Sequence, residues 1–192
     1  MAVMSQAPVS SQPVHRQPLD IPRPGRYLIS PEHSAAVIRT RHLFRLGAVR
    51  AALDLRDGRI AVTDPLRSST VAARFSVASF QSGNGTRDAA VLSAKLLNAE
   101  DFPSLTFTST ELVQPEDGQQ HGQWSLRGEL EVRGVARPVE VRIAALHVDG
   151  TMFRASAQAV IDRYDFGITA YRGLAARKLT VDLTVTAHRE ES

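Results

Sequence analysis

"WSLRGELEVRGVARPVEVRI" spans residues 124–143, and its apolar residues fall at every second position. One face of its first half carries Trp124, Leu126, Leu130 and Val132, whereas the charged residues of that half lie on the opposite face. Strict alternation of this kind predicts β-strands with one solvated face and one buried face. The pattern resumes after Gly134, so two strands are predicted, and the question is what their buried faces cover.

The length and composition indicate one globular domain preceded by a short extension. A chain of 192 residues is long enough to bury a full hydrophobic core. Residues 1–24 hold five of the ten prolines and no aromatic residue, so they are predicted to form a disordered leader rich in Pro, Gln and Ser. The folded domain is predicted to span residues 25–190. The absence of cysteine excludes disulfides and thiol catalysis.

The net charge of +3 does not identify a nucleic-acid-binding protein. Arginine supplies 21 of the 23 basic residues, but these are spread among acidic residues and form no basic run interleaved with aromatics. No nucleic-acid partner is therefore predicted. No apolar run approaches the roughly 18 residues of a membrane-spanning helix, and no secretory signal is evident, so no transmembrane segment and a cytoplasmic location are expected.

Short alternating runs separated by turn residues continue along the rest of the domain. The dipeptides Asp57-Gly58 and Asp149-Gly150 predict hairpin turns, because glycine readily adopts a positive φ. Residues 86–103 depart from the alternation: their apolar residues have helical spacing, and Pro103 follows the predicted helix. About eight to ten strands with little helix indicate an antiparallel sandwich or barrel.

The side chains predicted to face inward are apolar, and several of them are small. Residues 153–161 place on one face Phe153, Ala155, Ala157, Ala159 and Ile161. An antiparallel barrel of about eight strands can be filled by its own side chains or can hold one small ligand. From the residues alone, a packed core is the simpler interpretation, and a cavity for a neutral hydrocarbon is the alternative.

Six short motifs, taken together and in order, resemble those of the YceI-like polyisoprenoid-binding family. They are PEHS (31–34), RHL (41–43), SGNGTRD (82–88), FPSLTFTST (102–110), LRGELEVRGVARPVEV (126–141) and IDRYDFGIT (161–169). The resemblance covers about residues 25–189. It implies an all-β, antiparallel, lipocalin-like β-barrel of about eight strands, with a short helical cap and a long apolar pocket.

The resemblance also implies a function and a set of site residues. The function is non-catalytic binding, transport or sequestration of a long-chain isoprenoid or related lipid. The residues expected to contact the lipid are Phe75, Val77, Phe107, Trp124, Leu126, Leu130, Val141, Phe153, Ala155, Ala157, Phe166 and Leu183. At the cap, Arg87 and Asp88 are the candidates for contact with a head group, and a helix-capping Asp with a paired Arg is the alternative.

Two positions near the expected ends of the pocket stand out. The helix of the family commonly reads Arg-Asp-X-His-Leu, whereas this chain has Ala90 in place of the His, so a polar role of that side chain is absent. Gly167 is predicted to form a bend that turns Phe166 inward, where the ring contacts the ligand chain or closes one end of the barrel. An aromatic that only seals the core is the alternative.

Residues suited to catalysis or metal binding form no recognisable motif. The six histidines lack the His-X-His and His-Glu-X-X-His spacings of metal sites, and Asp162, Arg163 and Asp165 are interpreted as a structural ion pair at a strand end. No enzymatic activity, cofactor or metal is therefore predicted. The expected partner is a polyisoprenoid or other long-chain lipid, and a homodimer stays open. The competing hypothesis is a stress-related barrel with a filled core that acts through a protein partner.

Overall fold

The structure is a computed structural model that describes residues 20–41, 48–114, 124–173 and 175–191. Most of the predicted leader and the segment after the second predicted strand, residues 42–47, lie outside the described residues. The strands are β1 (Gly25–Ile29), β2 (Ala35–Arg41), β3 (Ala48–Leu53), β4 (Leu55–Val62), β5 (Thr70–Ser76), β6 (Ser104–Val113), β7 (Ser125–Val132), β8 (Val135–Asp149), β9 (Met152–Asp162) and β10 (Lys178–Arg189). One α-helix, α1 (Gly85–Leu92), and four short 3-10 helices accompany them in the described part of the chain.

The strands close into an antiparallel barrel with eight positions around its wall. Strand β10 pairs with β1 along its C-terminal part and with β2 along its N-terminal part, so β1 and β2 together occupy one position. Strands β3 and β4 pair with β2 and β1 respectively and are separated only by Asp54, so they form a second interrupted strand. The other six strands each occupy one position, which confirms the predicted lipocalin-like barrel.

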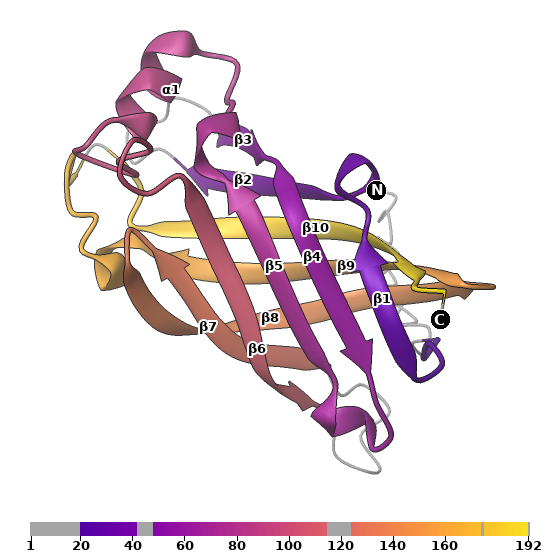
Figure 1. The fold of residues 1–192 in the computed structure, drawn as a ribbon. Coiled ribbons are helices and arrows are strands. Elements are labelled where there is room, and N and C mark those ends of the chain that lie inside the picture. Colours follow the sequence, from indigo (N-terminus) through magenta and orange to yellow (C-terminus); the bar gives the residue numbers. More distant parts are fainter. Residues whose placement is uncertain (1–19, 42–47, 115–123, 174, 192) are drawn as a thin grey trace, which may run out of the picture.

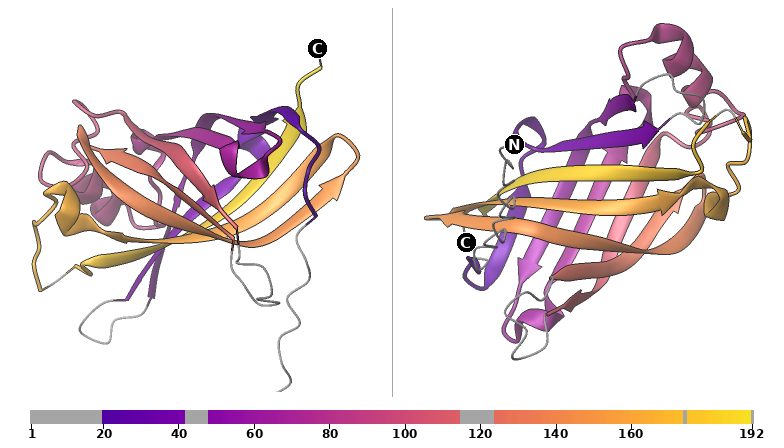
Figure 2. Two further views of the ribbon diagram at one scale, coloured as in Figure 1. Left: turned by 90° about the horizontal axis from the view of Figure 1, so that it is seen from below. Right: turned by 180° about the vertical axis from the view of Figure 1, so that it is seen from behind.

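Two groups of strands cross each other and form opposite sides of the barrel. Strands β4, β5 and β6 run diagonally across the front of Figure 1, whereas β8, β9 and β10 run behind them. Helix α1 lies at one end of this flattened barrel, as does the loop after β9 (Figures 1 and 2). The inward faces of both groups of strands therefore meet in the middle of the molecule. Within the described residues, no helix is long and apolar enough to cross a bilayer.

The stretch at residues 124–143 forms the β7–β8 hairpin, as its alternation predicts. Arg133 and Gly134 both have positive φ, 53° and 69°, which suits a two-residue turn between twisted antiparallel strands. The register then places Leu126 opposite Val141. The turn at Asp149-Gly150 is likewise confirmed, because β8 ends at Asp149 and β9 begins at Met152.

The hairpin turn predicted at Asp57-Gly58 is wrong. Both residues lie inside β4, beside an irregularity in its pairing with β5, and β4 turns into β5 only after Val62. Glycine is needed at position 58 for close packing, and not for a turn. A Cβ atom there would lie 2.6 Å from Cδ1 of Ile29, so glycine leaves the room that the isoleucine side chain occupies.

The helix predicted within residues 86–103 is present, but α1 ends at Leu92, before the last residues with helical spacing. Its N-cap is Asn84, whose side chain accepts a hydrogen bond from the backbone N–H of Arg87 at 3.0 Å. Ser93 adopts an extended conformation and terminates the helix. The leucines that follow, Leu96 and Leu97, lie in turns and point toward the barrel's interior, where they pack against Phe166 and Ile168.

Candidate functional site

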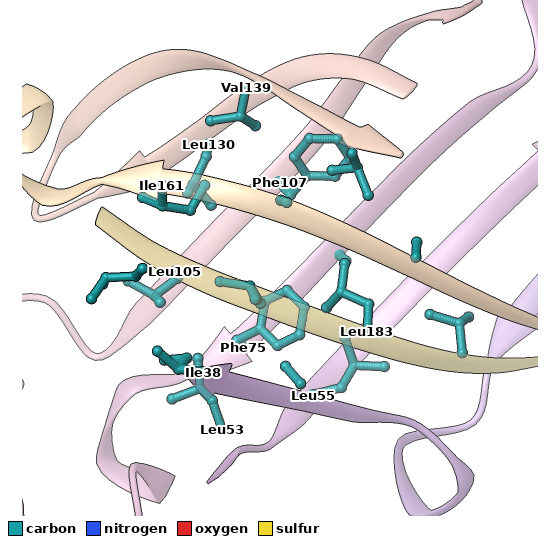
Figure 3. Close-up of a pocket in the computed structure, with 18 of the residues that line it drawn as sticks. Ile38, Leu53, Leu55, Phe75, Leu105, Phe107, Leu130, Val139, Ile161 and Leu183 are labelled. Carbon is teal, nitrogen blue, oxygen red and sulfur yellow. The ribbon is translucent and has the colours of Figure 1, made fainter. Parts of the chain in front are cut away.

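A cavity of about 590 Å³ lies between the two groups of strands. Figure 3 shows aliphatic and aromatic side chains from both sides pointing into it, among them Phe107 and Leu130 in the upper half of the view and Phe75, Leu183 and Leu55 below them. Every side-chain atom drawn there is carbon. A site of this volume falls in the range of small-molecule pockets, which are concave and mostly apolar.

The structure places the residues predicted to contact lipid around this one cavity, with a single exception. The lining includes Phe75, Phe107, Trp124, Leu126, Leu130, Val141, Phe153, Ala155, Ala157, Phe166 and Leu183. Val77 does not line it: this residue is 0% exposed and begins a 3-10 helix (Val77–Ser79) between β5 and α1. Val77 therefore packs in the wall and does not reach the cavity.

Several lining residues were not selected from the sequence. Figure 3 labels Ile38, Leu53, Leu55, Leu105 and Val139 among the side chains around the cavity. Leu53 ends β3 and Leu55 begins β4, so the break between these strands lies at Asp54 and not at the predicted Asp57-Gly58 turn. The alternation in each strand was the signal that could have found them.

Small residues on β9 leave much of the space open. Ala155, Ala157 and Ala159 all line the cavity, as the sequence suggested, and β10 and β8 flank them in register. Elsewhere a bulky neighbour fills the gap left by a small residue. A Cβ atom at Gly128 would lie 2.7 Å from the Phe107 ring, so that ring already occupies the available room. The alanine row is thus a stretch of the wall whose own side chains are small.

The polar atoms near the cavity are occupied by partners within the protein. Ser69 Oγ accepts a hydrogen bond from the Thr63 N–H at 3.0 Å, and Ser34 Oγ accepts one from the Thr186 N–H at 3.1 Å. Among the described residues, no buried side-chain nitrogen or oxygen lacks a hydrogen-bond partner. A ligand deep inside the cavity would thus meet apolar surface and, in the part of the chain that the structure describes, no buried side-chain donor or acceptor left without a partner.

Arg87 and Asp88 hold the loop before α1. Arg87 Nε donates to Ser82 Oγ at 2.7 Å and Arg87 Nη2 donates to the Ser82 carbonyl at 2.9 Å, while Asp88 accepts from the N–H and the hydroxyl of the same serine. Arg87 lines the cavity and Asp88 does not. Asp88 is not the helix cap, because Asn84 has that role. A contact of either residue with a head group remains a prediction.

Arg163 is the most buried charged residue that lines the cavity, with 6% of its surface exposed. It lies in the 3-10 helix Arg163–Phe166 that follows β9. Its guanidinium donates to four backbone carbonyls of the following loop, those of Ile168 (2.7 Å), Ala170 (2.8 Å), Ala175 (3.3 Å) and Ala176 (2.9 Å). Five N–H groups on a planar frame suit such a task. Arg163 therefore fixes the loop that borders this end of the cavity.

The interpretation of Asp162, Arg163 and Asp165 as one ion pair needs correction. Asp162 pairs with Arg177, whose Nε lies 2.7 Å from Asp162 Oδ2, and also caps the 3-10 helix by accepting from the Tyr164 N–H. Arg163 bonds only to carbonyls among the described partners, and Asp165 accepts from Arg137 through its backbone oxygen. Of these three residues, only Asp162 forms a structural ion pair within the described ranges, and its partner is Arg177.

Phe166 lies at the same end of the barrel and is 4% exposed. Gly167 has a φ of 72°, as expected for the bend. The ring packs in one cluster with Val132 and Ile168 and also lines the cavity. This position is compatible with both predicted roles, since the ring lies at this end of the barrel and borders the space for a ligand.

The opposite end of the cavity is bordered by residues assigned to the leader. Ile21 and Pro22 line it, and Tyr27 Oη donates to the Arg23 carbonyl at 2.8 Å. Asp20 also contacts His147 on β8, at 3.2 Å between Asp20 Oδ2 and His147 Nδ1. The last residues before the predicted boundary thus pack on the barrel.

Ionisable groups on the outer wall form a separate polar groove. Hydrogen bonds from Arg39 and Gln158 lower the pKa of Asp182, and the ion pair with Asp182 raises the pKa of Arg39. These residues lie on β2, β9 and β10 and their contacts join neighbouring strands. In the described ranges, no three His, Cys, Asp or Glu side chains lie close enough together to hold a metal ion. The groove is a cross-strand network of ordinary surface type.

Comparison with known proteins agrees with the geometry. A family model described as a YceI-like domain matches residues 27–188. A UPF0312 protein of Pectobacterium carotovorum is 32% identical over 119 residues, and one of Pectobacterium atrosepticum is 31% identical over the same length. Each match spans 59% of this chain and 59% of the relative.

Solved structures share the fold at low sequence identity. BcnA of Burkholderia cenocepacia has a TM-score of 0.71 and 16% identity, with 82% of this chain and 98% of that chain covered. A polyisoprenoid binding domain from Saccharophagus degradans, described as implicated in plant cell wall breakdown, has a TM-score of 0.64 and 12% identity, with 85% and 98% covered. At these identities the likeness concerns the fold.

Proposed function

Because the chain belongs to the YceI-like family, we propose that its barrel binds one long hydrocarbon chain, an isoprenoid or a related lipid, and carries or sequesters it without chemical change. The observation that supports this proposal most is the cavity: about 590 Å³ of space whose wall is apolar and alanine-lined. The polyisoprenoid-binding description of one structural neighbour points to the same class of ligand.

The volume of the cavity sets the length of chain that fits. An engineered apolar cavity of about 150 Å³ binds benzene, which has six carbon atoms. By that ratio, the 590 Å³ available here accommodates roughly 20 to 25 carbon atoms. This corresponds to four or five isoprene units, and a longer chain would extend out of the cavity.

Binding of such a chain needs no specific hydrogen bond. Transfer of one methylene group from water to an apolar site contributes about 0.8 kcal/mol. Affinity should therefore rise with chain length until the cavity is full. Chemical change of the ligand would require positioned acids, bases or nucleophiles, and the wall around the alanine row offers hydrocarbon instead.

Trp124 allows a direct test. It is the single tryptophan of the chain and lines the cavity, so a bound chain should change its fluorescence. We expect saturable titrations with the prenyl alcohols geraniol, farnesol and geranylgeraniol, with affinity increasing at each added isoprene unit. The variant Trp124→Phe controls for signal from free ligand. An unchanged spectrum with all three alcohols, together with no displacement of a bound fluorescent fatty acid, would favour a filled core that acts through a protein partner.

A further inference from the structure

Three arginines surround one aromatic ring in the loop after β9. The guanidinium carbons of Arg163, Arg172 and Arg177 lie 5.0, 5.1 and 5.0 Å from the centroid of the Tyr164 ring. Because all three carbons lie about equally far from the same centroid, any two of them are separated by at most about twice the distance to that centroid, so the three charges form one cluster. A guanidinium over an aromatic face is attracted to the ring, and where the side chain is exposed its N–H groups stay available for other partners.

This arginine cluster lies at the mouth of the cavity. Arg163, Tyr171, Ala175 and Ala176 belong to the same loop and line the cavity. Tyr171 is nevertheless 43% exposed, so the wall of the cavity reaches the solvent at this residue. Arg172 follows directly and is exposed. A group emerging from the cavity beside Tyr171 would therefore meet the cluster.

The positive charges of the cluster are unequally compensated. Arg163 donates to four carbonyls, and Arg177 pairs with Asp162. Arg172 makes no hydrogen bond or ion pair with any residue that the structure describes, apart from its stacking on Tyr164. Arg137, whose Nε donates to the Asp165 carbonyl at 2.9 Å, adds positive charge beside this loop, and Asp165 adds a carboxylate. The mouth thus carries an excess of cationic donors on this side.

Other parts of the site are poorly suited to an anion. The interior has no buried side-chain polar atom without a partner in the described residues, so a charged group placed there would lose its hydration without compensation. On the helix side of the mouth, the Arg87 guanidinium is bonded to Ser82. An anionic end of a bound chain would therefore be most stable beside Tyr164.

We propose that Arg172 and Arg177, the two exposed arginines of the cluster around Tyr164, bind a phosphate or diphosphate group on the end of the chain held in the cavity, while the buried Arg163 adds positive charge behind them. This inference rests on the proposed function and specifies its ligand as a prenyl phosphate or prenyl diphosphate. Phosphate oxygens accept charge-assisted hydrogen bonds from guanidinium edges, with Arg172 supplying the free donors. Tyr164 acts as the platform that keeps the three side chains together.

The test compares three probes that share parts of this ligand: geranylgeranyl diphosphate, geranylgeraniol and inorganic pyrophosphate. We expect the unaltered protein to bind the diphosphate about tenfold more tightly than the alcohol, because hydrogen bonds to a charged group contribute a free energy of this size. The preference should shrink as salt is raised. Arg172→Gln should lower the affinity for the diphosphate about tenfold more than the affinity for the alcohol.

Arg59→Gln is the matched control, because Arg59 is an exposed arginine on β4, away from the loop after β9. It should preserve the preference for the diphosphate. Equal affinities for the two prenyl probes, or equal effects of the two substitutions, would overturn the proposal. Binding of pyrophosphate that depends on Arg172, without any gain for the prenyl diphosphate, would also overturn it, since the anion would then be a free one. Failure of geranylgeraniol itself to bind would contradict the proposed function instead.

Discussion

Ala157→Phe is expected to abolish most lipid binding while the barrel stays folded. Ala157 lines the cavity at the middle of the alanine row on β9. A phenyl ring there would displace about five methylene groups of the ligand, which corresponds to about 4 kcal/mol, or a roughly thousandfold loss of affinity. Burial of the ring against apolar walls should leave the free energy of unfolding unchanged or raise it by up to about 2 kcal/mol.

Val160→Phe provides the matched control on the same strand. Val160 is 57% exposed and faces away from the cavity, so a ring there should leave the affinity for geranylgeraniol unaltered. Titration of both variants and urea unfolding give the comparison. If the interior were already full, Ala157→Phe would instead lower the free energy of unfolding by about 1–3 kcal/mol through overpacking. That result, with no specific loss of binding, would support a filled core.

Arg163→Met should cause the largest loss of stability among substitutions at the mouth. Methionine keeps part of the side chain's volume but leaves the carbonyls of four loop residues without their donor. We expect the free energy of unfolding to fall by about 3 kcal/mol, because buried and partly buried acceptors lose hydrogen bonds to a charged group. The loop should also exchange its amide hydrogens faster and release bound lipid more quickly.

Two further variants distinguish this role from a general effect of losing an arginine. Arg163→Lys keeps the charge but offers a compact ammonium group, so its stability should lie between those of the native protein and Arg163→Met. Arg154→Met removes an exposed arginine from the outer face of β9 and should have little effect. Coincident urea unfolding curves for Arg163→Met and Arg154→Met would show that the loop does not depend on the buried guanidinium.

The barrel was predictable because alternation repeats in nearly every strand. In the β7–β8 hairpin the apolar and charged faces separate cleanly, and Gly134 between the two strands has the positive φ that glycine readily adopts. Asp57-Gly58 also carries a local turn signal, yet both residues lie in β4, where Gly58 leaves room for the Ile29 side chain. A close contact between residues far apart in sequence left no local signal.

The cavity itself was only partly predictable. The alanine row on β9 indicated where space would remain, and the structure places that row on the lining. Val77 follows the same alternation, but β5 ends at Ser76, so its side chain turns into the wall. The role of Arg163 was missed because its partners are backbone carbonyls, which no pattern of side-chain types reveals.

Occupancy of the cavity by a single chain is the central claim, and native mass spectrometry tests it most directly. The purified protein would be incubated with excess geranylgeraniol and transferred intact, beside Ala157→Phe and Val160→Phe treated in the same way. The account predicts one added ligand mass per protein chain for the native protein and for Val160→Phe, and little or none for Ala157→Phe. An unliganded mass for the native protein, or equal occupancy in all three proteins, would contradict it.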